Sequence, residues 1–215
     1  DAQLQNVYLP PFRAAIQAGA GTIMSAYMDL KDVPATGNRW LLRDVLRGQW
    51  GLKGFVVSDN NAVNDLVPHG YASDKRDAAL RAFKSGVNME MASYSNAYST
   101  LREAVDQHAI DVAEVDAAVR PILATKFQLG LFEHPYVDEA KARAALQRAP
   151  EYQAEARLAA ERSAVLLRNE GKLLPLDPAA YKRIALIGPL ADSRQDTLGP
   201  WVFAHDLDDT VTIAQ

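Results

Sequence analysis

The stretch Gly54-Phe-Val-Val-Ser-Asp59 decides the fold class of this chain, and the polar residues Asn60 and Asn61 follow it. A continuous apolar run between a glycine and polar residues is typical of a strand buried on both faces, as in parallel sheets covered by helices. Loops at the carboxyl ends of such strands converge on ligands, which makes Asp59 a candidate for chemistry. The alternative is an Asp that caps the next helix or closes a turn.

The composition is that of a globular protein: the chain has 215 residues, of which 48% are hydrophobic and 23% charged. A net charge of -4 with scattered Lys and Arg offers no basic surface, so we expect no nucleic acid partner. No apolar run approaches the ~18 residues of a membrane span, so we expect no membrane partner either. The chain contains no cysteine, which excludes disulfides and thiolate sites. The absence of cysteine fits a protein of the bacterial cytoplasm, a periplasmic protein or a secreted protein equally well.

Helical and strand patterns alternate through the first half of the chain. Helical periodicity predicts helices over residues 4–18, 38–50 and 74–84, with Asn38 as an N-cap and Gly86 closing the third. Apolar runs predict strands over residues 22–27, 54–59 and 87–91. Alternation at steps of roughly thirty residues indicates consecutive βα units. Three such strands cannot close a barrel, because an eight-stranded barrel takes ~250 residues. They therefore form an open sheet or are part of a larger protein.

The second half of the chain predicts fewer strands. Two helical stretches, about 99–107 and 112–129, are followed by a Gly/Pro-marked boundary at residues 130–135. A charged, Ala-rich helix over about 150–167 comes next. The run Arg183-Ile-Ala-Leu-Ile-Gly188 then predicts a buried strand that opens a second α/β domain.

Six segments taken in order resemble glycoside hydrolase family 3: Tyr8-Leu-Pro-Pro-Phe12, Met24-Ser-Ala-Tyr27, Gly54-Phe-Val-Val-Ser-Asp59, Gly86-Val-Asn-Met-Glu-Met91, Lys126-Phe-Gln-Leu-Gly-Leu-Phe132 and Ser163-Ala-Val-Leu-Leu-Arg-Asn-Glu-Gly171. The resemblance covers essentially the whole chain and is greatest to bacterial two-domain β-glucosidases. It implies an α/β chain with the last three βα units of a (β/α)8 TIM-type barrel over residues 1–132. A linker with a helix then covers 133–180, and a truncated start of an α/β sandwich covers 181–215.

The same resemblance assigns roles to individual residues. Asp59 matches the catalytic nucleophile that forms a covalent glycosyl-enzyme, and Met24 and Tyr27 match residues that line the sugar subsite. A Tyr hydroxyl that donates to a carboxylate favours its charged form, as a nucleophile requires. On residue type alone, Met24 reads as core packing and Tyr27 as an amphipathic rim residue.

Two positions depart from the family pattern. Asn60 stands where the family usually has a Trp beside the nucleophile, which implies a more polar leaving-group side. In Leu198-Gly-Pro-Trp201, Pro200 replaces a serine, while Trp201 remains an aromatic wall of the substrate site or, alternatively, a core residue.

A retaining glycosidase needs a second carboxyl about 5–5.5 Å from the nucleophile. The resemblance places this acid/base outside the chain. Glu90 is the alternative, since it ends a neighbouring predicted strand, and its other role is a hydrogen bond within the rim.

The function that the resemblance implies is a retaining exo-acting β-glucosidase that removes terminal non-reducing β-D-glucosyl residues. The partners implied are a β-glucoside or oligosaccharide substrate and the rest of the same enzyme, with a homodimer left open. No cofactor and no metal is expected. The alternatives are a β-xylosidase or other β-hexosidase of the family, or a non-catalytic carbohydrate-binding remnant. As a fragment, the chain is expected to be inactive alone and to expose strand 22–27 as a sheet edge that aggregates or needs a complementary chain.

Overall fold

A computed structural model describes residues 2–146, 150–200, 202–203 and 205–215. The chain divides into two compact units, Asp1–Ala142 and Arg143–Gln215. The first unit contains a parallel sheet with helices between its strands and is therefore of the α/β class. Within the described residues, no helix is both long and apolar enough to cross a bilayer.

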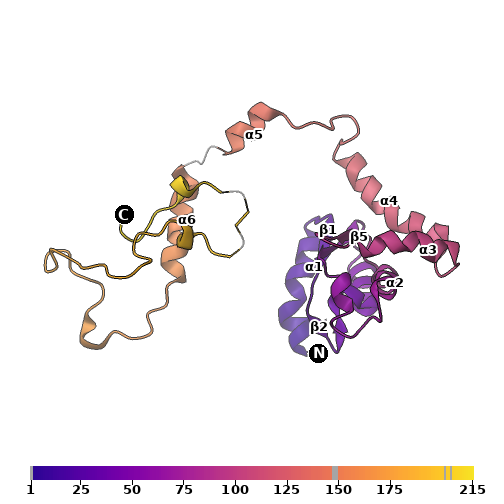
Figure 1. Cartoon of the computed structure of the whole chain (residues 1–215), viewed down its shortest axis with the longest axis horizontal. Helices are drawn as coiled ribbons and strands as arrows, with labels where there is room; N and C mark the ends of the chain where they lie inside the picture. Colours follow the sequence, from indigo (N-terminus) through magenta and orange to yellow (C-terminus); the bar gives the residue numbers. More distant parts are fainter. Residues whose placement is uncertain (1, 147–149, 201, 204) are drawn as a thin grey trace. The chain divides into compact units, whose positions relative to one another are not determined.

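The first unit alternates helices with short strands (Figure 1). Its elements are η1 (Leu4–Tyr8), α1 (Pro10–Gln17), β1 (Thr22–Ser25), β2 (Asp29–Leu30), β3 (Val33–Pro34), η2 (Ala35–Gly37), η3 (Trp40–Gln49), β4 (Phe55–Asn60), η4 (Asn64–Leu66), α2 (Lys75–Ser85), β5 (Met89–Met91), η5 (Ala97–Thr100), α3 (Leu101–Asp106) and α4 (Val112–Gln128). Helix α5 (Glu139–Leu146) spans the division between the units.

The three strands β1, β4 and β5 form one parallel sheet with β4 in the centre. Ser25 pairs with Ser58 in the register between β1 and β4, and Val57 pairs with Met89 between β4 and β5. The second pairing is interrupted by a bulge before Asn60 meets Met91. All three strands run in the same direction, so the loops after them emerge at one edge of the sheet.

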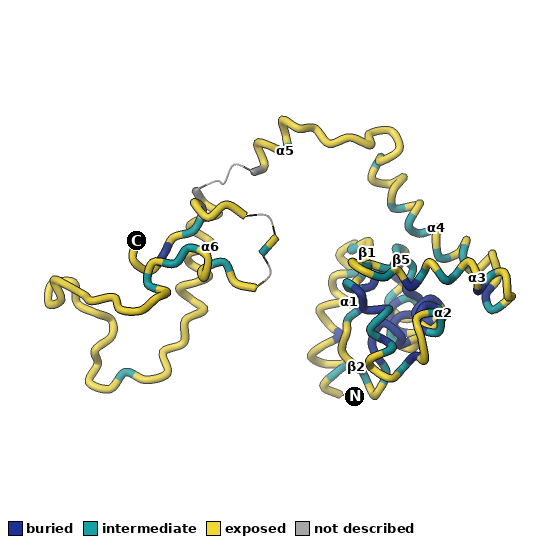
Figure 2. The backbone as a smooth tube through the Cα atoms, in the orientation of Figure 1, coloured by how far each residue is buried: buried dark blue, intermediate teal, exposed yellow. Residues whose placement is uncertain are grey.

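The core lies on one face of this sheet. Val56 and Ser58 of β4 are fully buried, and Val56 packs in a cluster with Leu42 and Leu46 of η3 and Ala79 of α2. Figure 2 shows the buried backbone gathered inside the first unit. Side chains alternate along a strand, so the half-buried Phe55, Val57 and Asp59 lie on the opposite face.

Local signals fix the ends of the central helices. The Asp74 carboxylate accepts a hydrogen bond from the Asp77 backbone N–H at 2.9 Å and caps α2. Gly86 ends the same helix with φ 115°, a left-handed conformation that glycine adopts without a steric penalty. Asn38 accepts from the Leu41 N–H at 3.0 Å and caps η3, as the sequence predicts. The helices expected over 38–50 and 74–84 are confirmed.

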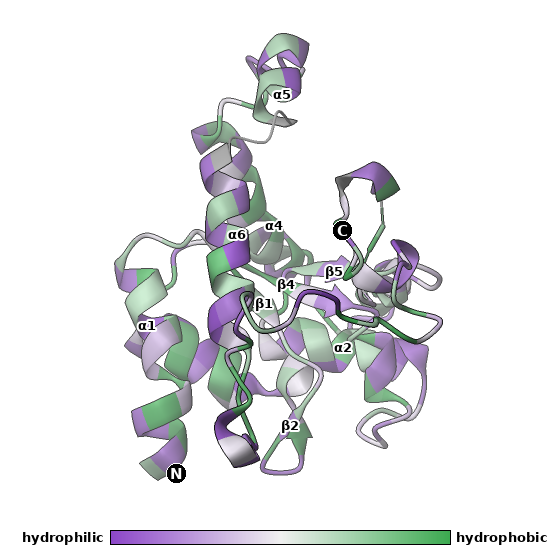
Figure 3. Ribbon diagram, turned by 90° about the vertical axis from the view of Figure 1, so that its left-hand side faces the viewer, coloured by the Kyte–Doolittle hydropathy of each residue, from purple (hydrophilic) through white to green (hydrophobic). Residues whose placement is uncertain are grey.

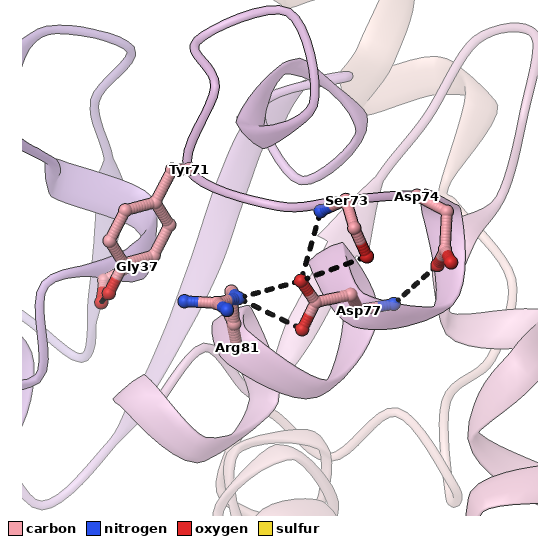
Figure 4. A network of polar contacts seen from close by, with 6 residues as sticks. All are labelled: Gly37, Tyr71, Ser73, Asp74, Asp77 and Arg81. Carbon is pink, nitrogen blue, oxygen red and sulfur yellow. Dashed lines mark hydrogen bonds and ion pairs between the residues drawn. The ribbon is translucent and has the colours of Figure 1, made fainter.

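Asp77 connects the start of α2 to the loop before it (Figure 4). Its carboxylate accepts from the Ser73 N–H at 3.0 Å and from Arg81 Nε at 2.9 Å. The Arg81 guanidinium also lies 5.0 Å from the ring centroid of Tyr71, whose hydroxyl donates to the Gly37 carbonyl. This network connects α2 to η2, the short helical turn that precedes η3.

Asn88 directly precedes β5 and connects the amino-terminal end of the sheet to the helices around it. Its Oδ1 accepts from the Val56 N–H at 2.9 Å and from Arg47 Nη2 at 2.6 Å. Its Nδ2 donates to the Ala118 carbonyl of α4 at 2.9 Å. Burial lowers the pKa of the Arg47 guanidinium, and the neighbouring charge of Arg43 acts in the same direction. One carboxamide thus joins β4, η3 and α4.

The helix expected over residues 4–18 consists of two pieces, η1 and α1, with Pro10 at the start of the second. Figure 3 shows α1 with hydrophobic and hydrophilic segments in alternation, as expected for an amphipathic helix. The first strand ends at Ser25, two residues earlier than predicted. A short hairpin of β2 and β3 follows, which the sequence did not predict; its turn residues Lys31 and Asp32 both have positive φ.

The described residues of the second unit contain the end of α5, one longer helix, α6 (Pro150–Ser163), and the short turns η6 (Glu170–Lys172), η7 (Gln195–Thr197) and η8 (Leu207–Asp209). Most of its described residues are exposed (Figure 2). The strand predicted at Arg183–Gly188 is wrong, because this run is not in a strand and Ile187 is 90% exposed. A strand needs hydrogen-bonded neighbours, and the described residues of this unit include no strand to pair with it. The helix predicted over about 150–167 is confirmed but ends at Ser163.

Candidate active site

Asp59 lies near the carboxyl end of the central strand β4. It is half-buried and lies on the sheet face opposite Val56 and Ser58, the residues that η3 and α2 cover. Its Oδ1 accepts a hydrogen bond from the Asn60 backbone N–H at 2.7 Å. A carboxylate in this position faces away from the core and is open to a ligand.

Met24 lies on the same face as Asp59. It pairs with Val57 in the register between β1 and β4, and paired residues of parallel strands point to the same side of the sheet. Half of the Met24 side chain is exposed. The structure therefore brings Met24 and Asp59, two of the predicted site residues, to one open face of the sheet.

Tyr27 lies in the loop after β1, two residues beyond Ser25. Its hydroxyl donates to the Asn60 carbonyl oxygen at 2.6 Å. Partial burial, and next the interaction with the Asp59 carboxylate, raise the pKa of the Tyr27 phenol. The phenol therefore stays protonated beside Asp59 and remains a hydrogen-bond donor at neutral pH. The sequence predicted this hydroxyl at the Asp59 carboxylate; in the structure it lies beside Asp59, but its hydrogen bond goes to the carbonyl oxygen of the next residue, Asn60.

Asn60 is held by the loop after β5. Its Oδ1 accepts from the Ser93 hydroxyl at 2.7 Å. The side chain of Asn60 thus binds Ser93, a residue for which no role was predicted. Trp201, the remaining predicted substrate contact, lies outside the described residues.

Residues 58–61 and 91–93 form a set of hydrogen bonds that sequence reasoning missed. The Met91 N–H donates to the Ser58 hydroxyl oxygen at 2.9 Å, and the Asn61 N–H donates to the Met91 carbonyl at 2.8 Å. The Ser93 N–H donates to Asn61 Oδ1 at 3.1 Å. One positional signal was available for Ser93: it follows β5 by two residues, as Tyr27 follows β1 by two.

Glu90, the alternative acid/base, caps the helical segment that follows it. Its Oε1 accepts from the Ala97 N–H at 2.9 Å and its Oε2 from the Tyr98 N–H at 2.7 Å. The Tyr98 hydroxyl donates to the Val87 carbonyl at 2.7 Å, and burial, then the negative charge of Glu90, raise the pKa of this phenol well above its usual range. Both carboxylate oxygens of Glu90 therefore have structural partners, which favours its role within the rim.

The described part of the chain holds no group of three or more His, Asp or Glu side chains placed to bind a metal ion. At the carboxyl edge of the sheet, the Asp59 carboxylate lies on the open face and the protonated phenol of Tyr27 lies next to it. A carboxylate of this kind acts as a nucleophile or as an electrostatic stabiliser of a positive centre.

The chain is similar to known proteins in both sequence and structure. Residues 1–125 match the family model described as Glycosyl hydrolase family 3 N terminal domain. A periplasmic beta-glucosidase of Salmonella typhimurium is 40% identical over 98% of this chain and 28% of the relative's length. A beta-xylosidase of Formosa agariphila is 35% identical over 94% of this chain and 29% of its own length.

Solved structures give the same result. The crystal structure of a beta-glucosidase from Listeria innocua in complex with glucose matches 98% of this chain and 28% of its own, with 38% identity and a TM-score of 0.79. A beta-glucosidase from Erythrobacter marinus matches 82% of this chain and 23% of its own, with 42% identity and a TM-score of 0.70. The chain thus spans less than a third of the length of these relatives.

Proposed function

The chain belongs to glycosyl hydrolase family 3, and on this premise we propose that the polypeptide containing it is a retaining, exo-acting β-glucosidase that uses Asp59 as its nucleophile. The observation that carries the proposal is the placement of Asp59 on the open face of the parallel sheet, with the Tyr27 hydroxyl beside it. Its substrate class is a β-glucoside or oligosaccharide with a terminal β-D-glucosyl residue.

In the first step of this reaction, an Asp59 oxygen attacks the anomeric carbon. A new C–O bond forms, the glycosidic C–O bond breaks, and an acid gives a proton to the leaving oxygen. In the second step, a water molecule loses its proton to the same group and displaces Asp59 from the sugar. The Tyr27 phenol beside Asp59 favours the charged carboxylate before the attack and again as Asp59 leaves the sugar in the second step. Met24 provides an apolar contact for the sugar ring. This chemistry requires neither a metal nor a cofactor.

We assign the acid/base to a part of the enzyme outside this chain. The two backbone N–H groups that bind Glu90 support this assignment, because a proton-transfer group needs a free oxygen next to the leaving group. The rest of the enzyme is accordingly a partner of this chain in catalysis, and Asn60 and Trp201 remain candidates for the leaving-group side.

We further propose that residues 1–132 are the last three βα units of a (β/α)8 barrel. A linker over 133–180 and the start of an α/β sandwich over 181–215 would follow. The parallel order β1-β4-β5, with the core helices on one face, supports the barrel because the inner face of a barrel carries no helices. The TM-score of 0.79 to the Listeria innocua enzyme supports it as well.

A β-xylosidase is the second candidate, because the Formosa agariphila relative with that name is 35% identical to this chain. A non-catalytic carbohydrate-binding remnant is the third. Both differ from the main proposal in the result of one labelling experiment.

The experiment is intact-protein mass spectrometry of the full polypeptide after reaction with an activated 2-fluoroglucoside, followed by peptide mapping. We expect one fluoroglucosyl group on Asp59, and none in Asp59→Asn. The control variant Asp106→Asn makes the same chemical change on the exposed surface of α3 and should label like the wild type. Labelling by a 2-fluoroxyloside alone would select the xylosidase, and labelling by neither would leave another β-hexosidase of the family or the binding remnant.

A further inference from the structure

The loop after β5 is attached to the end of β4 mainly through one small residue, Ser93. The Ser93 hydroxyl donates to Asn60 Oδ1 at 2.7 Å, and the Ser93 N–H donates to Asn61 Oδ1 at 3.1 Å. The side chains of Asn60 and Asn61, which directly follow Asp59, thus both accept a hydrogen bond from Ser93.

The hydrogen bond from Ser93 to Asn61 holds the backbone of the turn that follows Asp59. The Asn61 φ of 61° lies in the left-handed region, where a residue other than glycine is strained by about 1 kcal/mol. The residue is buried, and its N–H donates to the Met91 carbonyl at 2.8 Å. The hydrogen bonds to Met91 and Ser93 compensate for this strain and hold the turn that begins at Asp59.

Asn60 is held from two directions. Ser93 binds its side-chain oxygen, and the Tyr27 hydroxyl binds its backbone carbonyl oxygen at 2.6 Å. The Asn60 N–H, in turn, donates to Asp59 Oδ1 at 2.7 Å. A change in the backbone at Asn60 would therefore move the N–H that orients the Asp59 carboxylate.

We propose that Ser93 is a positioning residue for Asp59: by binding Asn60 and Asn61, it holds the Asp59 carboxylate in the orientation from which it attacks the anomeric carbon. Ser93 does not touch the sugar in this role. The inference rests on the proposed function of Asp59 as a nucleophile and adds a residue from a different loop to it.

The test measures two quantities in the full polypeptide during labelling by a saturating 2-fluoroglucoside: the rate constant of labelling and the final number of labels per protein. We expect Ser93→Ala to label about threefold to tenfold more slowly, as for the loss of one neutral hydrogen bond, and to reach one label per protein. Ser93→Thr keeps the hydroxyl and should label within twofold of the wild type.

Ser99→Ala is the matched control. Ser99 is an exposed serine whose hydroxyl binds only the nearby Asn96 carbonyl among the described contacts. This variant should label at the wild-type rate. The double variant Ser93→Ala with Asn60→Ala should be no slower than the slower of the two single variants, because both changes remove the same hydrogen bond.

Two results would overturn the positioning role while the proposed function stands. One is a wild-type labelling rate in Ser93→Ala. The other is an unchanged rate with fewer labels per protein, since that pattern means that a fraction of the protein is unfolded. A wild-type polypeptide that takes no label from any 2-fluoroglycoside would instead refute the proposed function, and the role of Ser93 would be rejected with it.

Discussion

The hydroxyl of Tyr27 and the backbone carbonyl oxygen of Asn60 are 2.6 Å apart and joined by a hydrogen bond, although 33 residues separate them in sequence. This bond connects the loop after β1 to the residue that follows Asp59. The neighbouring carboxylate contributes to the raised pKa of the phenol, so the donor proton is retained at neutral pH.

Removal of this hydroxyl should slow the chemistry of Asp59. In Tyr27→Phe we expect labelling by a 2-fluoroglucoside to fall about threefold to tenfold, because one hydrogen bond to the Asn60 carbonyl and the donor beside Asp59 are lost. The exposed Tyr136→Phe is the control and should label normally. A Tyr27→Phe variant with the wild-type rate would show that the phenol plays no part in orienting the carboxylate.

Glu90→Gln distinguishes a structural carboxylate from a catalytic one. We expect the pH dependence of kcat/KM to keep both limbs, because the acid/base is assigned elsewhere. Stability should fall by about 1–2 kcal/mol, since the neutral amide cannot accept both the Ala97 and the Tyr98 N–H groups equally well. The measurements are a pH–rate profile and a urea unfolding curve of the full polypeptide. Loss of the alkaline limb would make Glu90 the acid/base.

Gly54→Ala should prevent β4 from pairing with β1. A Cβ at position 54 would lie 1.6 Å from the Gly21 carbonyl oxygen. The backbones at Gly21 and Gly54 cannot move apart without breaking the pairing of β1 with β4, which begins at the next residues. We expect a loss of about 3 kcal/mol or more, seen as a lower urea midpoint or as insoluble protein. Gly48→Ala is the control, because its nearest contact is an ordinary 3.5 Å to the Arg43 carbonyl oxygen. In a helix interior this change should be neutral or stabilise by about 0.5–1 kcal/mol.

Asp77 gives a pH-dependent contribution to stability. Burial acts to raise the pKa of its carboxyl, but the hydrogen bonds from Ser73 and Arg81 and the charge of Arg81 outweigh it, and the pKa is lowered. The stabilisation is therefore fully present above the unfolded pKa of about 4 and is lost as the pH falls through the lowered folded pKa. Because both side chains are partly exposed, we expect Asp77→Asn to cost only about 0.5–1 kcal/mol at pH 7.

The check is the difference in urea midpoint between the wild type and Asp77→Asn as a function of pH. The difference should shrink toward zero near pH 2. A difference that stays constant from pH 7 to pH 2 would mean that the charge of Asp77 is irrelevant to stability.

Much of the first unit was predictable because its signals are local. The apolar run before Asp59 predicted the central strand, and capping chemistry predicted Asn38 at the start of the second helix and Gly86 at the end of α2. The order of helices and strands predicted a parallel sheet. The α/β class and the neighbourhood of Tyr27 and Asp59 followed from that order.

The elements that were not predicted depend on contacts between distant residues. The run Arg183–Gly188 has the composition of a strand, but composition provides no neighbour to pair with. The turn at Lys31 and Asp32 contains no glycine, whereas the sequence signal of a two-residue hairpin turn is a pair such as Asn-Gly or Asp-Gly. The contacts of Ser93 with Asn60 and Asn61 join two loops more than thirty residues apart, and no local pattern encodes them.

The three hydrogen bonds of the Asn88 side chain have a consequence for the order in which the unit folds. Its partners Arg47, Val56 and Ala118 are 41, 32 and 30 residues away in sequence, so one carboxamide closes three long loops. The entropy of closing a loop must be overcome before its contacts stabilise the chain. Because Val56 and Arg47 bind the Asn88 oxygen, its nitrogen is oriented toward α4, and we expect this helix to dock after the register between β4 and β5 is set.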